Sequence, residues 1–292
     1  MYNLKYDNTS NLNWLHVTYI VAIHMCALYA LLFDCINAKV ETLWLAIILW
    51  PISGLGVTAG AHRLWSHRSY SCHWVIRIFL MLAHSCANQL SIVAWTRNHR
   101  VHHKYAETNA DPHDASKGFW FSHVGHILQR PNKDVTIALS EMDVSDVLAD
   151  PVALFQLLCT PWIQNIMCFV VPSLFAFYGW QESFWRAMRI AGFLRYVMVL
   201  HFTWSVNSFA HLRGLRPYDQ TIGAVENKWV SFFALGEGWH NWHHKYPYDY
   251  MASERNYNFS QLFIDTFACV GLVYDRKRAI TAYRRQTNHH KN

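Results

Sequence analysis

Charged residues are scarce in this sequence: Asp, Glu, Lys and Arg make up 15% of its 292 residues, whereas a soluble domain usually has about 25%. Hydrophobic residues make up 52%, and there are 14 Trp and 15 Tyr, whose amphipathic rings favour the boundary between water and lipid. The basic residues are scattered, so we do not expect a nucleic-acid-binding protein. The composition predicts a membrane protein, and the formal net charge of +6 suits a surface facing anionic lipids or an acidic ligand.

Several sequence signals are also missing. The 7 cysteines form no CxxC pair and most lie in apolar stretches, which favours free buried thiols over disulfides or a zinc site. Residues 1–13 are polar and lack the basic region and the small-residue cleavage site of a signal peptide. There is no internal repeat and no low-complexity tract. We therefore expect a single domain over residues 1–292.

Four apolar stretches have about the 20 residues that a membrane-spanning helix needs. The predicted spans are residues 14–33, 43–61, 155–178 and 184–206. A fifth apolar stretch, residues 74–95, contains polar side chains, so we interpret it as one or two helices at the membrane interface, with a further span as the alternative. We predict an all-α integral membrane protein in which four transmembrane helices, arranged as two hairpins, lie under a helical cap made of residues 62–150 and 211–292.

The basic residues predict the orientation. Of the 25 Lys and Arg, nine lie between Arg63 and Lys133 and eleven between Arg213 and Lys291. The positive-inside rule places both segments, and the N-terminus with them, in the cytosol. Arg189 falls inside the fourth predicted span, where an ionisable side chain usually faces the interior of the bundle.

Histidine is abundant, with 19 residues, and many of them are clustered. The clusters are HRLWSH at residues 62–67, HRVHH at 99–103 and HNWHH at 240–244. In the HxxHH pattern, positions i, i+3 and i+4 share one face of an α-helix, so three imidazoles point the same way. All three clusters lie just outside predicted spans on the same predicted side, so the topology lets them converge.

The first cluster has a different spacing. His62 and His67 differ by about 140° around an α-helix, so they cannot share a face of one straight helix. We therefore expect His62 at the cytosolic end of the second span and His67 beyond a bend.

Clusters of nitrogen ligands favour Zn, Cu, Fe or Ni over Mg or Ca. The eight clustered histidines exceed what one ion uses, so we expect two ions. Two irons can reduce dioxygen and remove hydrogen from an unactivated C–H bond, whereas zinc, which has no redox chemistry, would indicate hydrolysis. No Ser/His/Asp or Cys/His nucleophile motif supports a hydrolase. Seven other histidines are interpreted as satisfied polar residues rather than ligands: His16, His24, His73, His84, His201, His289 and His290.

Around these clusters the sequence resembles the membrane acyl-CoA desaturases of the stearoyl-CoA desaturase family. The resemblance covers nearly the whole chain, and the matching stretches are TAGAHRLWSHRSY (58–70), HRVHHK (99–104), NADPH (109–113), FSHVG (121–125), VNSFAH (206–211), GEGWHNWHH (236–244) and PYDY (247–250). It implies nine histidine ligands for two Fe²⁺ ions. One iron would take His62, His67, His99, His103 and His243. The other would take His102, His211, His240 and His244, with Asn207 in contact through water.

The resemblance also implies the reaction and its partners. A cis double bond would enter a saturated fatty acyl-CoA, with O2 reduced to water and electrons supplied by cytochrome b5 and its NADH-dependent reductase. The enzyme would lie in the endoplasmic reticulum membrane. Trp204 would line a bent acyl tunnel near its kink, and Trp50 and Gly54 would lie at its far end, although ordinary bundle packing is the alternative for all three.

For the CoA headgroup, the resemblance implies contacts from Arg97, Asn98 and Arg130. Here the sequence departs from the family pattern. Asn98 stands where Asp is usual, Leu90 replaces an Asn, and Pro131 replaces a basic residue. These departures fall among the residues expected to contact the substrate headgroup, whereas the predicted metal ligands are all present. Two alternatives remain open: a fatty-acyl hydroxylase or bifunctional enzyme with the same di-iron chemistry, and a non-catalytic descendant that binds lipid.

Overall fold

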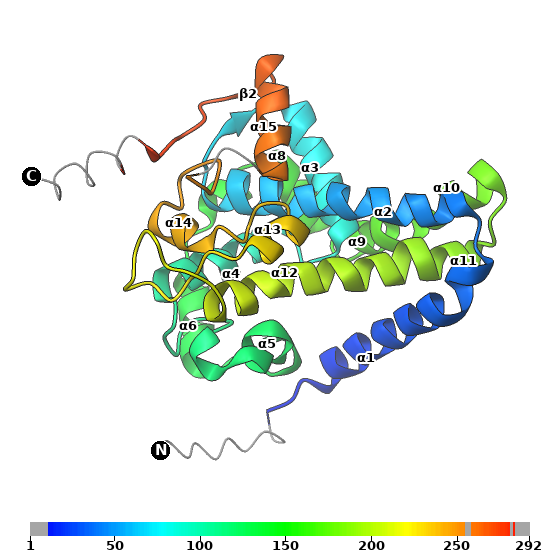
Figure 1. Ribbon diagram of the computed structural model, residues 1–292, viewed down its shortest axis with the longest axis horizontal. Helices are drawn as coiled ribbons and strands as arrows, with labels where there is room; N and C mark the ends of the chain where they lie inside the picture. The colour runs from blue at the N-terminus through cyan, green and yellow to red at the C-terminus, as the bar shows by residue number, and fades with distance from the viewer. Residues whose placement is uncertain (1–10, 255–257, 281–282, 284–292) are drawn as a thin grey trace, which may run out of the picture.

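The computed structural model describes residues 11–254, 258–280 and 283, and these are mostly helical (Figure 1). The predicted cap segment 211–292 therefore lies partly outside the described residues. The α-helices are α1 Trp14–Tyr29, α2 Val40–Leu55, α3 Trp74–Ala87, α4 Ile92–Tyr105, α5 His126–Leu128, α6 Lys133–Glu141, α7 Ser145–Leu148, α8 Pro151–Leu158, α9 Trp162–Asn165, α10 Val171–Trp180, α11 Phe184–Ala187, α12 Arg195–Leu212, α13 Lys228–Phe233, α14 His240–Lys245 and α15 Phe259–Cys269.

Shorter elements join these helices. The π-helical segments are Ala30–Asp34, Gly56–Ser66, Phe121–Gly125, Ile166–Val170 and Met188–Leu194, and the 3-10 turns are Cys35–Asn37 and Ala115–Lys117. The expected all-helical class has one small exception. Strands β1 Ser71–Cys72 and β2 Val273–Tyr274 pair antiparallel, which ties the chain after the first histidine cluster to the C-terminal segment.

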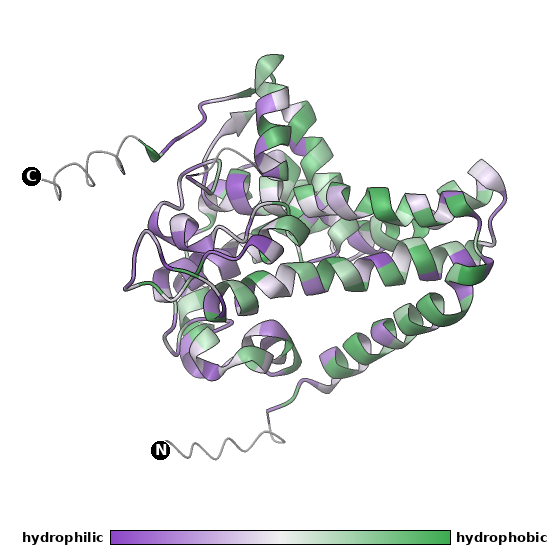
Figure 2. Ribbon diagram, in the orientation of Figure 1, coloured by the Kyte–Doolittle hydropathy of each residue, from purple (hydrophilic) through white to green (hydrophobic). Residues whose placement is uncertain are grey.

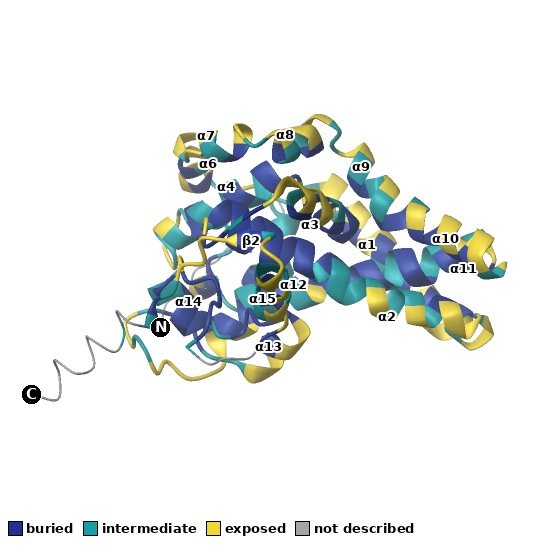
Figure 3. Ribbon diagram, turned by 90° about the horizontal axis from the view of Figure 1, so that it is seen from above, coloured by how far each residue is buried: buried dark blue, intermediate teal, exposed yellow. Residues whose placement is uncertain are grey.

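Three helices are long and apolar enough to cross a membrane: Trp14–Asn37, Val40–Ser66 and Trp162–Trp180. They correspond to three of the four predicted spans. Large apolar side chains such as Leu31, Leu32 and Phe33 are exposed on them, as a lipid-facing surface requires. The long helices extend together toward one side of the molecule, while the polar ribbon gathers around α4 and α14 at their other end (Figure 2). The same extended helices carry alternating exposed and buried faces (Figure 3).

The third predicted span begins later than expected. It starts at Trp162 rather than at Phe155, because Phe155 belongs to the separate helix α8. Pro161 explains the break, since proline lacks the backbone N–H and disfavours helical geometry at the residue before it.

The fourth predicted span is an uninterrupted helix from Phe184 to Leu212, longer than the expected 184–206. It is not among the three helices that are long and apolar enough to cross a membrane, and it contains three basic side chains, Arg186, Arg189 and Arg195. Arg186 donates to Glu182 over 3.1 Å, and Arg189 donates to Asp34 over 3.0 Å. Arg195 is buried and donates to backbone carbonyls of neighbouring helices. Partners within the protein thus satisfy charges that lipid would not.

The fifth apolar stretch forms two helices, α3 and α4, as one of the expected arrangements. They meet at an angle of 81°, and only when taken together are they long and apolar enough to count as a further span. The connection contains two residues with positive φ, Asn88 at 48° and Leu90 at 66°. Leu90 is strained there, because only Gly and, less often, Asn adopt this conformation readily. The bend turns α4, with the second histidine cluster, across the end of the long helices (Figure 1).

Candidate metal centre

His62 lies near the end of the second span, as expected, but the chain reaches His67, the C-cap, through a π-helix rather than a bend. Gly56–Ser66 has π-helical geometry, and the backbone N–H of His67 donates to the carbonyl of His62 over 3.1 Å. A hydrogen bond from residue i+5 to residue i places side chains five apart on the same face. The imidazole centroids of His62 and His67 are therefore 4.9 Å apart without a break in the helix.

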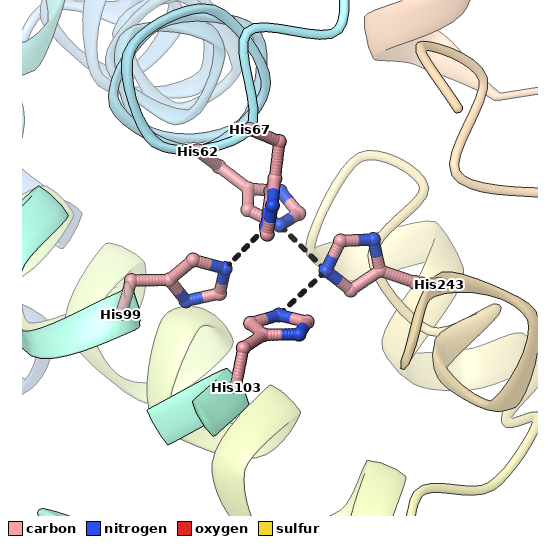
Figure 4. A group of neighbouring side chains, drawn as sticks. All are labelled: His62, His67, His99, His103 and His243. Carbon is pink, nitrogen blue, oxygen red and sulfur yellow. Dashed lines mark hydrogen bonds between the residues drawn. The ribbon is translucent and has the colours of Figure 1, made fainter. Parts of the chain in front are cut away.

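The other histidines come from three further helices. His99, His102 and His103 lie on α4, and the spacing i, i+3, i+4 points their rings toward one region. His240, His243 and His244 lie on α14 with the same spacing, and His211 lies near the end of α12. Figure 4 shows five of these rings, from three separate segments of the chain, facing one another.

The nine predicted ligands fall into two groups that could each hold a metal ion. The nitrogen atoms of each group lie within 4.8 Å of one another, and the groups are His62, His67, His99, His103 and His243, and then His102, His211, His240 and His244. This is the division that the resemblance implied. In the first group the Nε2 atom of His243 lies 3.0 Å from Nε2 of His62 and 2.9 Å from Nε2 of His103. In the second group Nε2 of His240 lies 3.1 Å from that of His211 and 3.0 Å from that of His244.

Two buried carboxylates lie behind the histidines. The Nδ1 atom of His62 lies 2.9 Å from Oε2 of Glu237, whose other oxygen accepts a bond from Arg63 over 2.8 Å. The Nδ1 atom of His102 lies 2.9 Å from a carboxylate oxygen of Asp111. Each carboxylate favours the tautomer with the proton on Nδ1, which leaves the lone pair of Nε2 facing into the cluster.

The charge states of these groups fit metal binding. Burial, and then the charges of neighbouring imidazoles, lower the pKa of His240, His243 and His244 well below the usual value for histidine. Burial alone would raise the pKa of Glu237, but the charges of Arg63 and His62 outweigh it and hold that pKa below its ordinary value. Neutral imidazoles and ionised carboxylates behind them are the form in which a metal is bound.

The nitrogens face one another in a way that hydrogen bonds alone do not explain. A neutral imidazole has one N–H, and a carboxylate claims that proton on both His62 and His102. Their Nε2 lone pairs then point at further Nε2 atoms, and a cation between them would satisfy every lone pair at once. Nine imidazole nitrogens with no oxygen ligand among them suit a borderline transition metal.

A narrow apolar cavity of about 60 Å³ opens on the histidines. His62, His99, His102 and His240 form one end of it. Its other walls are mainly apolar side chains of α2, α12 and α13. Three residues predicted as substrate or metal contacts also line it: Trp50, Gly54 and Asn207.

The other predicted substrate residues lie elsewhere among the described residues. Trp204 is buried, but it lines a neighbouring groove rather than the apolar cavity. Arg97 and Asn98 lie on α4 beside the second cluster, and the amide of Asn98 donates to the carbonyl of Ala94 over 2.8 Å. Arg130 is exposed after α5.

Leu90 and Pro131, two of the departures from the family pattern, are also exposed. The five residues assigned to the headgroup or its altered shell thus line neither the cavity nor the groove.

Sequence reasoning missed Glu237 and Asp111. Both were in view, because Glu237 belongs to the GEGWHNWHH stretch and Asp111 to the NADPH stretch. The signal that could have found them is chemical: a histidine ligand usually donates its second nitrogen to a carboxylate or carbonyl, so acidic residues inside the matching stretches were candidates.

Comparison with known proteins agrees with this geometry. The family model for fatty acid desaturases matches residues 42–262. The chain is 47% identical to stearoyl-CoA desaturase 5 of Bos taurus over 268 residues, which is 91% of this chain and 80% of the relative. It is 45% identical to the acyl-CoA Delta-9 desaturase of Acheta domesticus, over 90% of this chain and 74% of the relative. The Delta(9)-fatty-acid desaturase fat-7 of Caenorhabditis elegans is 44% identical over 90% of this chain and 79% of its own length. The chain belongs to the fatty acid desaturase family.

Proposed function

We propose that this protein is an acyl-CoA desaturase that inserts a cis double bond into a saturated fatty acyl-CoA. One observation carries the proposal: nine imidazoles form two groups that could each hold a metal ion, and four of these rings line a narrow apolar cavity. Such an arrangement holds an unbranched alkyl chain against an oxidising centre. The relatives named above are all called acyl-CoA or fatty-acid desaturases, which agrees with this chemistry.

Two iron ions would be held by the two histidine groups already described. Bound there, they would supply the oxidising power, with O2 as the oxidant, that removing hydrogen from an unactivated C–H bond requires. Glu237 and Asp111 would keep protons on Nδ1 of His62 and His102, which preserves Nε2 of both rings as ligands. Asn207, on the wall beside His102 and His240, would contact the second iron through water.

The protein's own contribution would be position. No group in the apolar cavity activates one methylene over its neighbours, so the bond that reacts is the bond held beside the histidines. Trp50 and Gly54 would bound the far end of the chain, and the apolar walls would exclude water from it. Arg97, Asn98 and Arg130 would meet the CoA headgroup outside the cavity, and Trp204 would approach the acyl chain only from the groove side.

We further propose the topology and location. The three apolar helices and the helix Phe184–Leu212 would be four spans in the endoplasmic reticulum membrane. The histidine end would face the cytosol, with both termini there, because the basic residues are concentrated in the segments at that end. This side would also receive electrons from cytochrome b5 and its NADH-dependent reductase.

The test is expression in yeast that lacks its own desaturase, followed by mass spectrometry of fatty-acid methyl esters. We expect monounsaturated products and restored growth without added unsaturated fatty acid. Hydroxylated products without unsaturation would replace the proposal with a hydroxylase, and a mixture would indicate a bifunctional enzyme.

A variant pair tests whether the histidine site is responsible. His102→Ala removes one ring of the second group and its contact with Asp111, so unsaturated product should be lost. His73→Asn is the control, because His73 is an exposed helix N-cap and Asn is an equally good one. A lipid phenotype that survives unchanged in His102→Ala would favour a non-catalytic lipid-binding role.

A further inference from the structure

A second hollow lies beside the apolar cavity. It is a groove of about 820 Å³ between α1, α12, α13 and the segment before α5. Its walls are mainly apolar and aromatic, with Trp120, Phe209 and Trp229 among them. Two residues, Phe202 and Phe233, line both the groove and the cavity. These two side chains therefore separate the two hollows.

The two rings form one stacked unit. Their centroids are 5.0 Å apart, and their planes differ by 18°. Trp50 supports the pair from the cavity side, with its ring centroid 5.3 Å from that of Phe202 and its Nε1 donating to the carbonyl of Phe233 over 3.3 Å. Phe233 is 39% exposed and lines both hollows, so this side chain alone lies between the cavity and the open groove at its position.

Phe202, on α12, lies away from the clustered histidine that the same helix carries. On α12, Phe202 precedes His211 by nine residues, which corresponds to about 14 Å along an α-helix. Trp50 precedes His62 by twelve residues along the second span, so it lies at the same remote end. The pair therefore faces the part of the cavity where the methyl end of a bound acyl chain would lie.

We propose that Phe202 and Phe233 set the longest acyl chain that the enzyme accepts, by closing the cavity from the groove. This inference rests on the proposed desaturase function and adds residues that neither the sequence motifs nor the expected tunnel end included. An alkyl chain that reaches the aromatic pair must stop or turn there. If either ring is replaced by a methyl group, the cavity joins the groove, and a longer chain can continue into an apolar space.

The expected effect is large. One methylene that fits or fails to fit an apolar pocket changes the specificity ratio by about 10-fold or more. A chain that is two carbons too long for the wild-type cavity should therefore gain at least that factor, relative to the preferred chain, when the aromatic pair is opened.

The experiment uses the full-length protein in desaturase-deficient yeast supplied with an equal mixture of even-numbered saturated fatty acids. Phe202→Ala and Phe233→Ala are compared with wild type by the chain-length profile of the monounsaturated methyl esters. The matched control is Phe232→Ala, since Phe232 is the neighbouring ring, is 66% exposed and lines neither hollow. Phe202→Leu is included because it keeps most of the apolar contact and should fold even if the alanine variant does not.

We expect the product maximum to move to longer chains in both alanine variants, partly in Phe202→Leu and not in Phe232→Ala. If wild type forms unsaturated product but the chain-length profile is unchanged in Phe202→Leu and in the folded alanine variants, the inference is overturned. The proposed function then stays intact. An equal shift of the product profile in Phe232→Ala would also overturn it, since the effect would then not come from opening the wall between the cavity and the groove. Absence of unsaturated product from wild type would overturn the proposed function and this inference with it.

Discussion

Glu237 contacts both His62, a predicted metal ligand, and Arg63, a buried cation, and its replacement tests both contacts. The carboxylate lies between His62 and Arg63, and Glu237 and Arg63 are 6% and 1% exposed. It accepts from Arg63 Nη2 over 2.8 Å and from Arg63 Nε over 3.2 Å, while its other oxygen lies 2.9 Å from His62 Nδ1. Removing the carboxylate should therefore affect folding and metal affinity together.

The two effects have different sizes and can be separated. Glu237→Ala leaves the Arg63 guanidinium buried without its counter-charge, which costs about 3–5 kcal/mol of folding free energy. The lower end is expected, because Arg63 keeps bonds to the carbonyl of Tyr250 and to Asn258. Loss of the carboxylate behind a histidine ligand typically weakens metal affinity about 10–100-fold.

Glu237→Gln distinguishes the two causes. Its amide oxygen can still accept from Arg63, so the loss of folding stability should be smaller, about 1–3 kcal/mol. Its NH2 group then faces His62, and it favours the tautomer with the proton on Nε2. That proton blocks the nitrogen that faces His243, so the loss of metal affinity should be as large as in Glu237→Ala.

Two assays are used. Thermal unfolding in detergent is monitored by tryptophan fluorescence, and iron affinity is measured from the iron content during titration with a chelator. Glu41→Gln is the control, since Glu41 is an exposed residue in the first turn of α2. Wild-type iron affinity in Glu237→Gln would refute the tautomer argument. A wild-type unfolding temperature in Glu237→Ala would refute the argument from the buried ion pair.

Three further predictions follow from the same structure. Gly56→Ala should lower the unfolding temperature of the detergent-solubilised protein, because a Cβ atom would lie 2.0 Å from the backbone N of His84, and overpacking of this kind costs about 1–3 kcal/mol or more. Gly179→Ala should be nearly neutral in the same measurement, since a Cβ atom there has nothing within 4 Å. Asp111→Asn should weaken iron binding about 10–100-fold in a chelator titration through His102, and wild-type affinity would contradict the role given to this carboxylate. Removing the metal by chelation should lower the unfolding temperature, and restoring Fe²⁺ should raise it again, because an ion that binds only the folded state stabilises it; no change would argue against a structural contribution from the metal.

The two HxxHH clusters could be predicted from sequence because their geometry is local. The spacing i, i+3, i+4 determines a common face on any α-helix, and both clusters lie on α-helices, α4 and α14. The long apolar stretches were predictable for a similar reason, since length and composition alone decide whether a helix can cross a membrane.

The first cluster could not be predicted in the same way. An α-helix separates His62 and His67 around its axis, and the sequence contains no signal that Gly56–Ser66 would be π-helical over so many residues. The segment is buried throughout and lies against α3, with Gly56 in close approach to its backbone, so we infer that packing favours the wider helix. The interaction that decides the side-chain direction is thus tertiary, and a local pattern does not contain it.

The predicted start of the third span was wrong for a different reason. The apolar residues continue from Phe155 through Leu158, so an average over a hydropathy window does not show the helix break at Pro161. For the helix Phe184–Leu212, a hydropathy measure makes the opposite error and underestimates how well the helix suits a membrane. Its arginines lower its apolar character, yet Asp34 and Glu182 neutralise two of them inside the protein. A hydropathy window scores the arginines as charges and does not record the carboxylates that pair with them, Asp34 at the end of the first span and Glu182 just before this helix.

The candidate metal centre depends on parts of the chain that contribute no predicted ligand. His102 and His211 belong to the same group, yet the residues between them include α10 and most of the helix Phe184–Leu212, which carries His211 near its end. The hairpin that they form must return the chain to the histidine end, or α12 and α14 cannot deliver His211 and the third cluster. The contacts of Asp34 and Glu182 hold the hairpin at its far end, where Lys39 N–H and Thr42 also donate to Glu182. Arg186 and Arg189 make those contacts and lie on the continuous helix Phe184–Leu212, which also carries His211. We therefore expect residues remote from the site to help determine whether its nitrogens converge.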